Sequence, residues 1–203
     1  TMKPFSMCPT CKRDYLSGRR RHAQTVSCFE CGPWYVLEYF DGKEHFAGKE
    51  SSVDTAINLL RNGKILGLKG VSGYQLVSLP KNDTAANLRE IKGRESKPFA
   101  VMFSDVDRIK ECCYVTSFEE ELLNSSARPI VLLDKKKDFP NEVCKDSDFI
   151  GAFLPSAGVH RLLCDALGPL IVTSANRSGE PMITDDEEFE RVFFDSEKIK
   201  SRS

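Results

Sequence analysis

The stretch GKILGLKGVSGYQLVSL, residues 63–79, decides the expected fold of this chain. Its first glycine ends a helix that Ser51 or Ser52 caps. The apolar runs 65–68 and 74–79 then predict two short strands, because glycine and polar residues bound each run. A helix followed directly by two strands indicates a domain that mixes both kinds of element.

The chain beyond this stretch repeats the alternation. Further helices are expected over residues 83–91, 105–112, 117–124 and 158–167, and further strands over 99–103, 129–133, 149–154 and 170–173. Asp83 is expected to cap the first of these helices, with an inward face made of Ala85, Ala86, Leu88 and Ile91. The apolar run 129–133 predicts a buried strand. Together these elements predict an α/β (α+β) fold with a mostly covered sheet.

Composition sets broad limits on function. The chain has 203 residues, of which 40% are hydrophobic, and a formal net charge of −1. These values predict a soluble globular protein of one or two domains with a substantial core. A charge near zero argues against a dedicated nucleic-acid binder. With neither a signal peptide nor an apolar span, the expected compartment is the cytoplasm, and no membrane partner is expected.

Two cysteine pairs stand before the α/β region, Cys8-x2-Cys11 and Cys28-x2-Cys31, with 16 residues between them. Four thiolates in this spacing predict a structural Zn2+ site, which would supply the folding energy of a segment without hydrophobic periodicity. Disulfides and a redox dithiol are the alternatives, and a reducing compartment disfavours the former. His22 is a competing ligand. The other cysteines are expected to be buried or idle thiols: Cys112, Cys113, Cys144 and Cys164.

A hairpin is expected between the cysteines and the α/β region. The run from Trp34 to Phe40 predicts a strand, Asp41-Gly42 a tight turn, and Lys43 to Phe46 the returning strand. We therefore divide the chain into residues 1–48, a zinc-knuckle and hairpin region, and residues 49–203, the α/β domain.

Three polar segments are candidates for chemistry. Lys69 to Gly73 joins a lysine to small residues, which permits close approach of an anion, although this segment alone favours a plain turn. Lys92, Arg94 and Lys97 flank a glycine and a proline, so they form either a phosphate or carboxylate clamp or a solvated helix end.

The third segment, 173–179, follows a predicted strand and offers Ser174 and Asn176 at its end. Open α/β sheets place ligands at such strand ends, although a polar capping loop would have the same composition. His160 opens an amphipathic helix and is interpreted as a packing or capping residue. No serine–histidine–aspartate arrangement is recognisable.

These segments, in this order, resemble a known family. Residues 1–33 are similar to the second zinc-finger-like motif of HypF, the carbamoyltransferase of hydrogenase maturation. The segments that resemble the YrdC-like domain following that motif are GKILGLKGVSGYQL, NLREIKGRESKPFAVM, RPIVLL, GAFLPSAGVHRLL and VTSANRSGEP. The resemblance extends from Thr1 to about Arg202 and implies a twisted mixed sheet with helices. It also implies that the chain is a fragment of a longer enzyme.

The resemblance implies a function in turn. HypF-like enzymes release carbamate from carbamoyl phosphate, join it to ATP as carbamoyl-adenylate, and transfer the carbamoyl group to the acceptor HypE. The YrdC-like part would perform the adenylation, with Mg2+ arriving on ATP. Lys92 and Arg94 match the family's K-x-R pair, with Lys97 extending it, and would hold the phosphates. Ser174 and Asn176 match S-x-N, and Lys69 is the implied carbamate holder.

The chain departs from the family pattern at three places. The gap between the cysteine pairs is two residues shorter than usual. Ser72, Tyr74 and Gln75 replace glycine, phenylalanine and histidine, and Ser156-Ala157-Gly158 replaces tyrosine-threonine-proline. Both groups of replacements are expected to line the pocket.

Three alternatives stay open. They are a threonylcarbamoyl-adenylate synthase for tRNA modification, which normally lacks the cysteines, an antibiotic-type O-carbamoyltransferase, and a zinc-knuckle RNA-binding module. The last rests on the basic run Arg19–Arg21, with Tyr15 and Trp34 as stacking residues.

Overall fold

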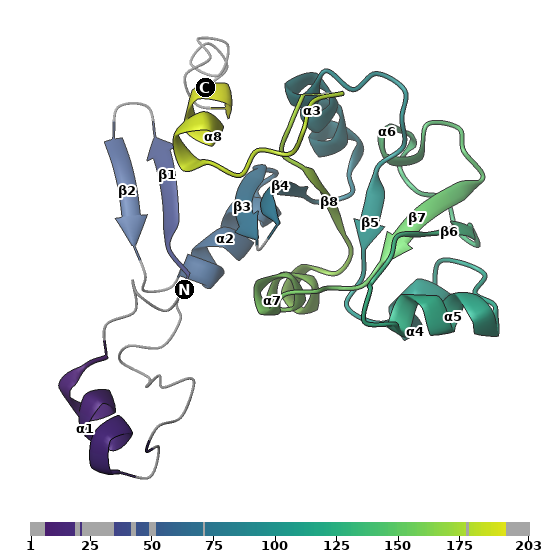
Figure 1. The fold of residues 1–203 in the computed structure, drawn as a ribbon. Coiled ribbons are helices and arrows are strands. Elements are labelled where there is room, and N and C mark those ends of the chain that lie inside the picture. Colours follow the sequence, from purple (N-terminus) through teal and green to yellow (C-terminus); the bar gives the residue numbers. More distant parts are fainter. Residues whose placement is uncertain are drawn as a thin grey trace.

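A computed structural model describes residues 7–18, 21, 35–41, 44–48, 52–70, 72–177 and 179–193 (Figure 1). Its helices are α1 (Pro9–Ser17), α2 (Ser52–Arg61), α3 (Asn82–Lys92), α4 (Val106–Lys110), α5 (Ser117–Asn124), α6 (Asn141–Cys144), α7 (Gly158–Leu167) and α8 (Asp186–Phe193). Its strands are β1 (Leu37–Asp41), β2 (Glu44–Gly48), β3 (Leu66–Gly70), β4 (Gly73–Ser78), β5 (Ala100–Met102), β6 (Val131–Asp134), β7 (Phe149–Phe153) and β8 (Leu170–Ser174).

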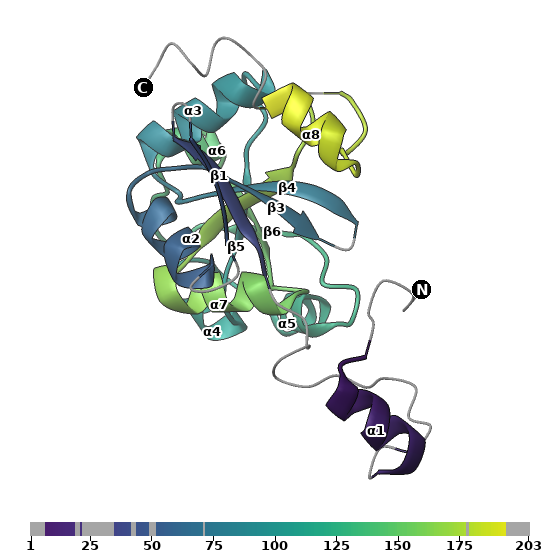
Figure 2. The same cartoon turned by 90° about the vertical axis from the view of Figure 1, so that its left-hand side faces the viewer.

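The main sheet has six strands in the order β3-β4-β8-β5-β7-β6. All neighbours are antiparallel except β5 and β7, which run parallel. Figure 2 shows the sheet between two helical layers, with α3, α6 and α8 on one side and α2, α4, α5 and α7 on the other. The expected α/β class with a mixed sheet is therefore confirmed.

The core has two parts because side chains alternate between the faces of each strand. Leu76, Val101 and Ile171 pack toward α3 and α8 in one buried cluster. Their sequence neighbours on the other face, Val77, Met102 and Val172, pack with residues of α2 and α7 in a second cluster. Each buried aliphatic side chain stabilises the fold by about 1.5–3 kcal/mol relative to exposure. This alternation decides which face each site residue occupies.

Two predictions about α3, its inward face and its capping residue, are wrong. On α3, Ala86 and Ile91 are exposed, while Arg89 and Lys92 are buried beside Ala85 and Leu88. Asp83 lies inside α3, where its carboxylate accepts the Thr84 N–H, and Lys81 occupies the N-cap position.

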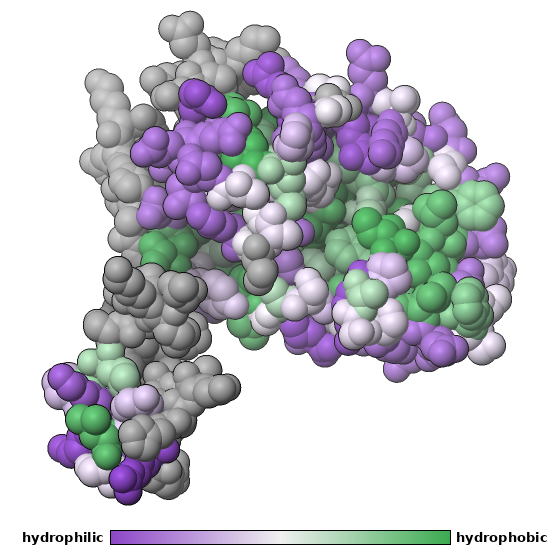
Figure 3. Space-filling view, viewed as in Figure 1, coloured by the Kyte–Doolittle hydropathy of each residue, from purple (hydrophilic) through white to green (hydrophobic). Residues whose placement is uncertain are grey.

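The strand predicted over 129–133 is the edge strand β6 rather than a buried one. Ile130 is 58% exposed and Leu132 is 70% exposed, and Figure 3 shows apolar side chains gathered on the surface where Figure 1 places β6 and β7. An apolar run predicts burial only when both faces are covered, and here only one face of β6 meets the core, through the buried Leu133 and the partly buried Val131.

The remaining elements agree with the sequence except for three unpredicted helices, α1, α6 and α8. The hairpin is confirmed, since β1 pairs antiparallel with β2 and Asp41 lies opposite Glu44. Among the described residues, no helix is both long enough and apolar enough to cross a membrane.

Candidate functional site

Lys92 is the centre of the candidate site. It ends α3, and Gly93 follows in the left-handed conformation with φ of 61°. The Lys92 side chain is only 2% exposed, and its Nζ donates to Asn176 Oδ1 at 2.8 Å, to the Asn176 carbonyl at 3.0 Å and to the Ser174 carbonyl. Three acceptors match the three protons of an ammonium group. The structure therefore brings Lys92, Ser174 and Asn176 together, as the family resemblance implies.

The electrostatics of Lys92 are unusual. Burial, with a smaller contribution from the nearby positive charge of Arg94, lowers the pKa of Lys92 from 10.5 to about 8. Among the described residues, no carboxylate pairs with Lys92, so all three of its partners are neutral oxygens. A bound anion would supply the missing countercharge and raise this pKa again.

Ser174 and Asn176 are positioned by β8 and the loop after it. The Ser174 hydroxyl donates to Asn176 Oδ1 at 2.7 Å, and Asn176 Nδ2 donates to the Glu180 carbonyl. The backbone between them is fixed as well, because the Ala175 N–H donates to the Tyr74 carbonyl at 2.8 Å. These bonds hold a polar strand end next to a buried cation, which is a suitable arrangement for an anionic ligand.

Arg94 lies in the loop after α3, and its guanidinium donates hydrogen bonds to backbone carbonyls of the same loop. Its guanidinium donates to the Lys97 carbonyl at 3.0 Å and to the Pro98 carbonyl, and lies 4.9 Å from the centre of the Phe99 ring. Lys97 itself is exposed. The three cations thus follow one another from a buried to an exposed position, which extends positive charge outward from Lys92.

Arg89 is a buried residue that the sequence does not identify. Its guanidinium donates to the carbonyls of Arg94 at 3.2 Å and Lys97 at 3.1 Å, and pairs with Glu142 at 3.2 Å. It also lies 4.7 Å from the Phe99 ring. Arg89 therefore shapes the loop that carries Arg94. Its spacing of three residues from Lys92 on α3 was the only sequence signal for this role.

Lys69 is not part of this cluster in the structure. It forms an ion pair with Asp186 at the start of α8, and the same carboxylate accepts the Tyr74 hydroxyl at 2.9 Å. The Tyr74 ring stacks on Phe189 with centroids 4.0 Å apart. The hydrogen bond from Lys69 is the largest cause of a lowered pKa at Asp186. Lys69 thus lies on the α8 side of the sheet and is half-exposed.

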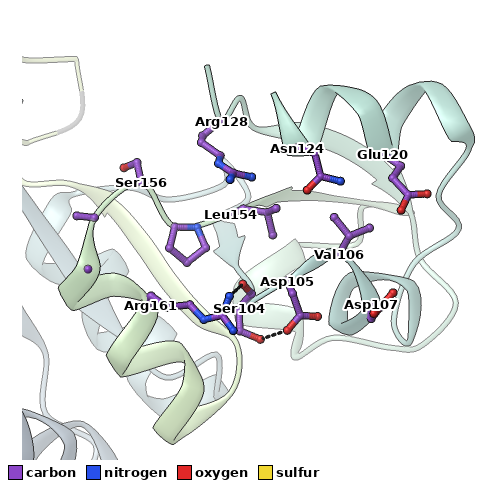
Figure 4. A pocket seen from close by; sticks show the side chains of 13 residues that line it. Ser104, Asp105, Val106, Asp107, Glu120, Asn124, Arg128, Leu154, Ser156 and Arg161 are labelled. Carbon is purple, nitrogen blue, oxygen red and sulfur yellow. Dashed lines mark hydrogen bonds between the residues drawn. The ribbon is translucent and has the colours of Figure 1, made fainter. Parts of the chain in front are cut away.

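A separate cavity of about 520 Å3 contains the second group of departures, Ser156-Ala157-Gly158 (Figure 4). Arg161 crosses it and donates to the Ser104 carbonyl at 3.1 Å. None of Lys92, Arg94, Lys97, Ser174, Asn176 or Lys69 lines it. The register explains why. β7 ends at Phe153, which pairs with Met102 of β5. Met102 lies opposite Leu170, the first residue of β8, whereas Ser174 is the last. The prediction that both groups of departures line one pocket is therefore wrong for this cavity.

His160 lies on α7 and is 4% exposed. Neither ring nitrogen has a hydrogen-bond partner among the described residues, and burial lowers the pKa of this imidazole. Burial without a partner favours a neutral ring that packs in the core, which agrees with the interpretation from the sequence.

The first cysteine pair lies at the start of α1. Cys8 is the N-cap, and its Sγ accepts the Cys11 N–H at 3.5 Å. Cys11 is buried at 3% exposure, one turn further along. This arrangement places two sulfurs on the same short turn, which fits a tetrahedral zinc site. Cys28, Cys31 and His22 lie outside the described residues.

Comparison with known protein families finds two family models that match successive parts of the chain. A model of the HypF finger family matches residues 7–38. A model of the family Sua5_yciO_yrdC, described as "Telomere recombination", matches residues 58–199. This chain belongs to the Sua5/YciO/YrdC family. The resemblance to HypF that its motifs predict is confirmed by the finger and by the relatives.

The relatives are much longer than this chain. It is 35% identical over 192 residues to the carbamoyltransferase HypF of Rhodobacter capsulatus, which covers 93% of this chain and 25% of the relative. It is 36% identical over 152 residues to a probable carbamoyltransferase HypF of Methanocaldococcus jannaschii, covering 73% of this chain and 20% of the relative. The chain thus spans about a quarter or less of these relatives.

Solved structures also include a HypF relative that is much longer than this chain. Full-length HypF in a phosphate- and nucleotide-bound form is 39% identical, with a TM-score of 0.78 over 94% of this chain and 25% of that one. Sua5 of P. abyssi, complexed with L-threonine, is 19% identical, with a TM-score of 0.63 over 72% of this chain and 45% of that one. At that identity, the likeness to Sua5 shows the fold alone.

Proposed function

We propose that this chain is the part of a HypF-type carbamoyltransferase that makes carbamoyl-adenylate from ATP and carbamate. The observation that carries the proposal is the buried Lys92, which is held against Ser174 and Asn176 with no carboxylate partner in the described part of the chain. The nucleotide- and phosphate-bound state of a HypF relative supports a nucleotide ligand. Carbamate would come from carbamoyl phosphate through a part of the enzyme that lies outside this chain.

The proposed step needs no nucleophile from the protein. A carbamate oxygen attacks the α-phosphorus of ATP, a new O–P bond forms, and the bond from that phosphorus to the bridging oxygen breaks. Pyrophosphate leaves with the bridging oxygen and its electron pair. The reactants bring together about five negative charges, so the protein's contribution is alignment and offsetting of charge.

Each cation has a proposed place in this step. Lys92 and Arg94 would hold the phosphates and offset the charge that develops on the departing pyrophosphate, and Lys97 would extend this wall outward. Ser174 and Asn176 would hydrogen-bond the phosphate or the carbamoyl group. Lys69 would contribute to carbamate binding only after its ion pair with Asp186 opens.

Metal ions have two proposed roles. Mg2+ would enter on the ATP phosphates, where it neutralises charge during phosphoryl transfer. Zn2+ would be held by Cys8, Cys11, Cys28 and Cys31 as a closed structural site within residues 1–48. We place the adenylating domain in residues 49–203, the protein in the cytoplasm, and the final transfer to a HypE-type acceptor in the full-length enzyme.

An exchange assay tests this proposal. Radiolabelled pyrophosphate should enter ATP only when carbamate is present, and the chain should bind Mg2+-ATP in calorimetry. Arg94→Ala should reduce the exchange rate by roughly 100-fold, because it removes a guanidinium that would offset the charge developing on the pyrophosphate. Lys64→Ala, at an exposed lysine between α2 and β3, is the matched control and should leave exchange unchanged.

Two results would overturn the proposal. One is a failure of the folded chain to bind ATP, and the other is full exchange activity in Arg94→Ala. Exchange that requires L-threonine and bicarbonate in place of carbamate would favour the tRNA-modification alternative.

A further inference from the structure

Gln75 lies beside the candidate site and has no role in the mechanism above. It stands on β4, where it pairs directly with Ser174 of β8 on one side and with Leu68 of β3 on the other (Figure 1). Residues directly opposite in an antiparallel pair project from the same face, with Cβ atoms about 4.5–5.5 Å apart. The Gln75 side chain is therefore a direct neighbour of Ser174, whose carbonyl binds Lys92.

The face that Gln75 occupies is opposite to that of Lys69. Tyr74, the register partner of Lys69, stacks on Phe189 of α8, and Lys69 pairs with Asp186 of the same helix. Since side chains alternate along β4, Gln75 projects to the other face, where Val77 packs. Of these two polar residues, Gln75 is therefore the one that shares its face with Ser174.

The carboxamide oxygen of Gln75 has no hydrogen-bond partner within the part of the chain that the structure describes. Gln75 Oε1 is shielded from solvent and accepts no hydrogen bond from any described residue, although the side chain as a whole is only partly buried. It lies 4.0 Å from the position that a Cβ on Gly70 would take. An unpaired buried acceptor costs free energy, so a ligand N–H that reaches it gains both a bond and relief of that cost. The terminal torsion of glutamine is broad, which lets the oxygen turn toward a ligand.

We infer that Gln75 is a specificity residue that accepts a hydrogen bond from the NH2 group of the carbamoyl moiety. This inference rests on the proposed function. A carbamoyl group has an oxygen side, which suits Lys92 and its neighbours, and an amino side with two N–H donors. An acetyl group has nearly the same shape but no donor. An acceptor placed across one strand pair from the cation site therefore selects the carbamoyl group.

Two stable adenylate analogues test this inference. They are 5′-O-[N-(carbamoyl)sulfamoyl]adenosine and 5′-O-[N-(acetyl)sulfamoyl]adenosine, which differ only in an NH2 or CH3 group at the acyl end. The chain should bind the carbamoyl analogue about tenfold more tightly, as expected when one side of a buried hydrogen bond is lost. Dissociation constants from calorimetry give the ratio.

Variants of Gln75 separate hydrogen bonding from shape. Gln75→Met keeps the length of the side chain but removes the acceptor, so the two analogues should bind equally. Gln75→Glu keeps an acceptor and should retain the preference for the carbamoyl analogue. Thermal unfolding of each variant checks that the sheet is intact. If Gln75→Met loses affinity for both analogues by the same factor, the role of Gln75 is merely structural and the inference is overturned.

The failure of this inference is distinguishable from failure of the proposed function. If the wild-type chain binds neither analogue nor ATP, the adenylate-forming proposal itself falls. If it binds both analogues with equal affinity, and Gln75→Met changes nothing, nucleotide binding stands and only the role of Gln75 is wrong.

Discussion

Two lysines of this domain, Lys92 and Lys69, were both predicted to bind the substrates, yet they occupy opposite environments. Lys92 is buried, bonds only neutral oxygens among the described residues and has a lowered pKa. Lys69 is 49% exposed and pairs with a carboxylate that is 65% exposed. The described surroundings of Lys92 thus leave its positive charge without a countercharge, whereas Lys69 already has the carboxylate of Asp186 as its countercharge.

The difference shows which lysine is prepared for an anion. Burying an ammonium group is costly unless its protons are bonded, and the three oxygens around Lys92 meet that requirement without cancelling its charge. A surface ion pair such as Lys69–Asp186 contributes about 0–1 kcal/mol and must open before Lys69 can bind anything else. Burial thus favours Lys92 as the fixed cation of the site, with Lys69 as a residue that joins α8 to the sheet.

The largest expected effect is on stability. Lys92→Met should lower the free energy of unfolding by roughly 3 kcal/mol, because the Ser174 and Asn176 oxygens lose their donor in a place with little access to water. Lys69→Met, the matched control on the half-exposed lysine, should change it by at most about 0.5 kcal/mol. Urea denaturation followed by circular dichroism measures both. Equal changes in the free energy of unfolding would contradict the inferred difference between Lys92 and Lys69.

A smaller effect is expected from pH. The pKa of Lys92 is about 8 in the folded protein and 10.5 without burial, so between these values the unfolded chain binds more protons than the folded one. Stability contributed by this group therefore rises with pH across that window and is lowest below pH 8. Relative to Lys92→Met, the wild type should gain about 1–2 kcal/mol between pH 7 and pH 9.5. A difference between the two proteins that stays constant with pH would contradict the low pKa.

Much of the fold could be predicted because the hydrophobic periodicity of most segments matches the faces that are buried in the structure. The amphipathic α2 and α7 and the alternating β4 and β8 carry their own periodicity. Burial of β6 could not be predicted, because an apolar run does not reveal whether a neighbouring layer exists. α8 was missed because its apolar residues, Phe189 and Phe193, stand among acidic ones and become buried only against the sheet.

The site was harder to predict than the fold. Residue spacing alone did not decide whether Lys92 belongs to an anion clamp or to a solvated helix end. The family resemblance was needed to assign Lys92, Ser174 and Asn176 to one site. Arg89 could not be identified, since arginine on a helix is normally exposed and its partners are loop carbonyls and Glu142 of α6. The separation of Lys69 from Gln75 depends on strand register, which fixes the face of every side chain at once.

The smallest expected effect sharpens the role of Lys69. Asp186→Asn removes the carboxylate that holds Lys69 but keeps an oxygen for the Tyr74 hydroxyl, so stability should change by less than about 0.5 kcal/mol. If Lys69 contributes to carbamate binding, its release should lower the KM for carbamate several-fold in the exchange assay, with the KM for ATP unchanged. Asp107→Asn, at an exposed position on α4, is the control. An unchanged KM for carbamate would leave Lys69 with a structural role only, because release of its ammonium group from Asp186 would then not have strengthened carbamate binding.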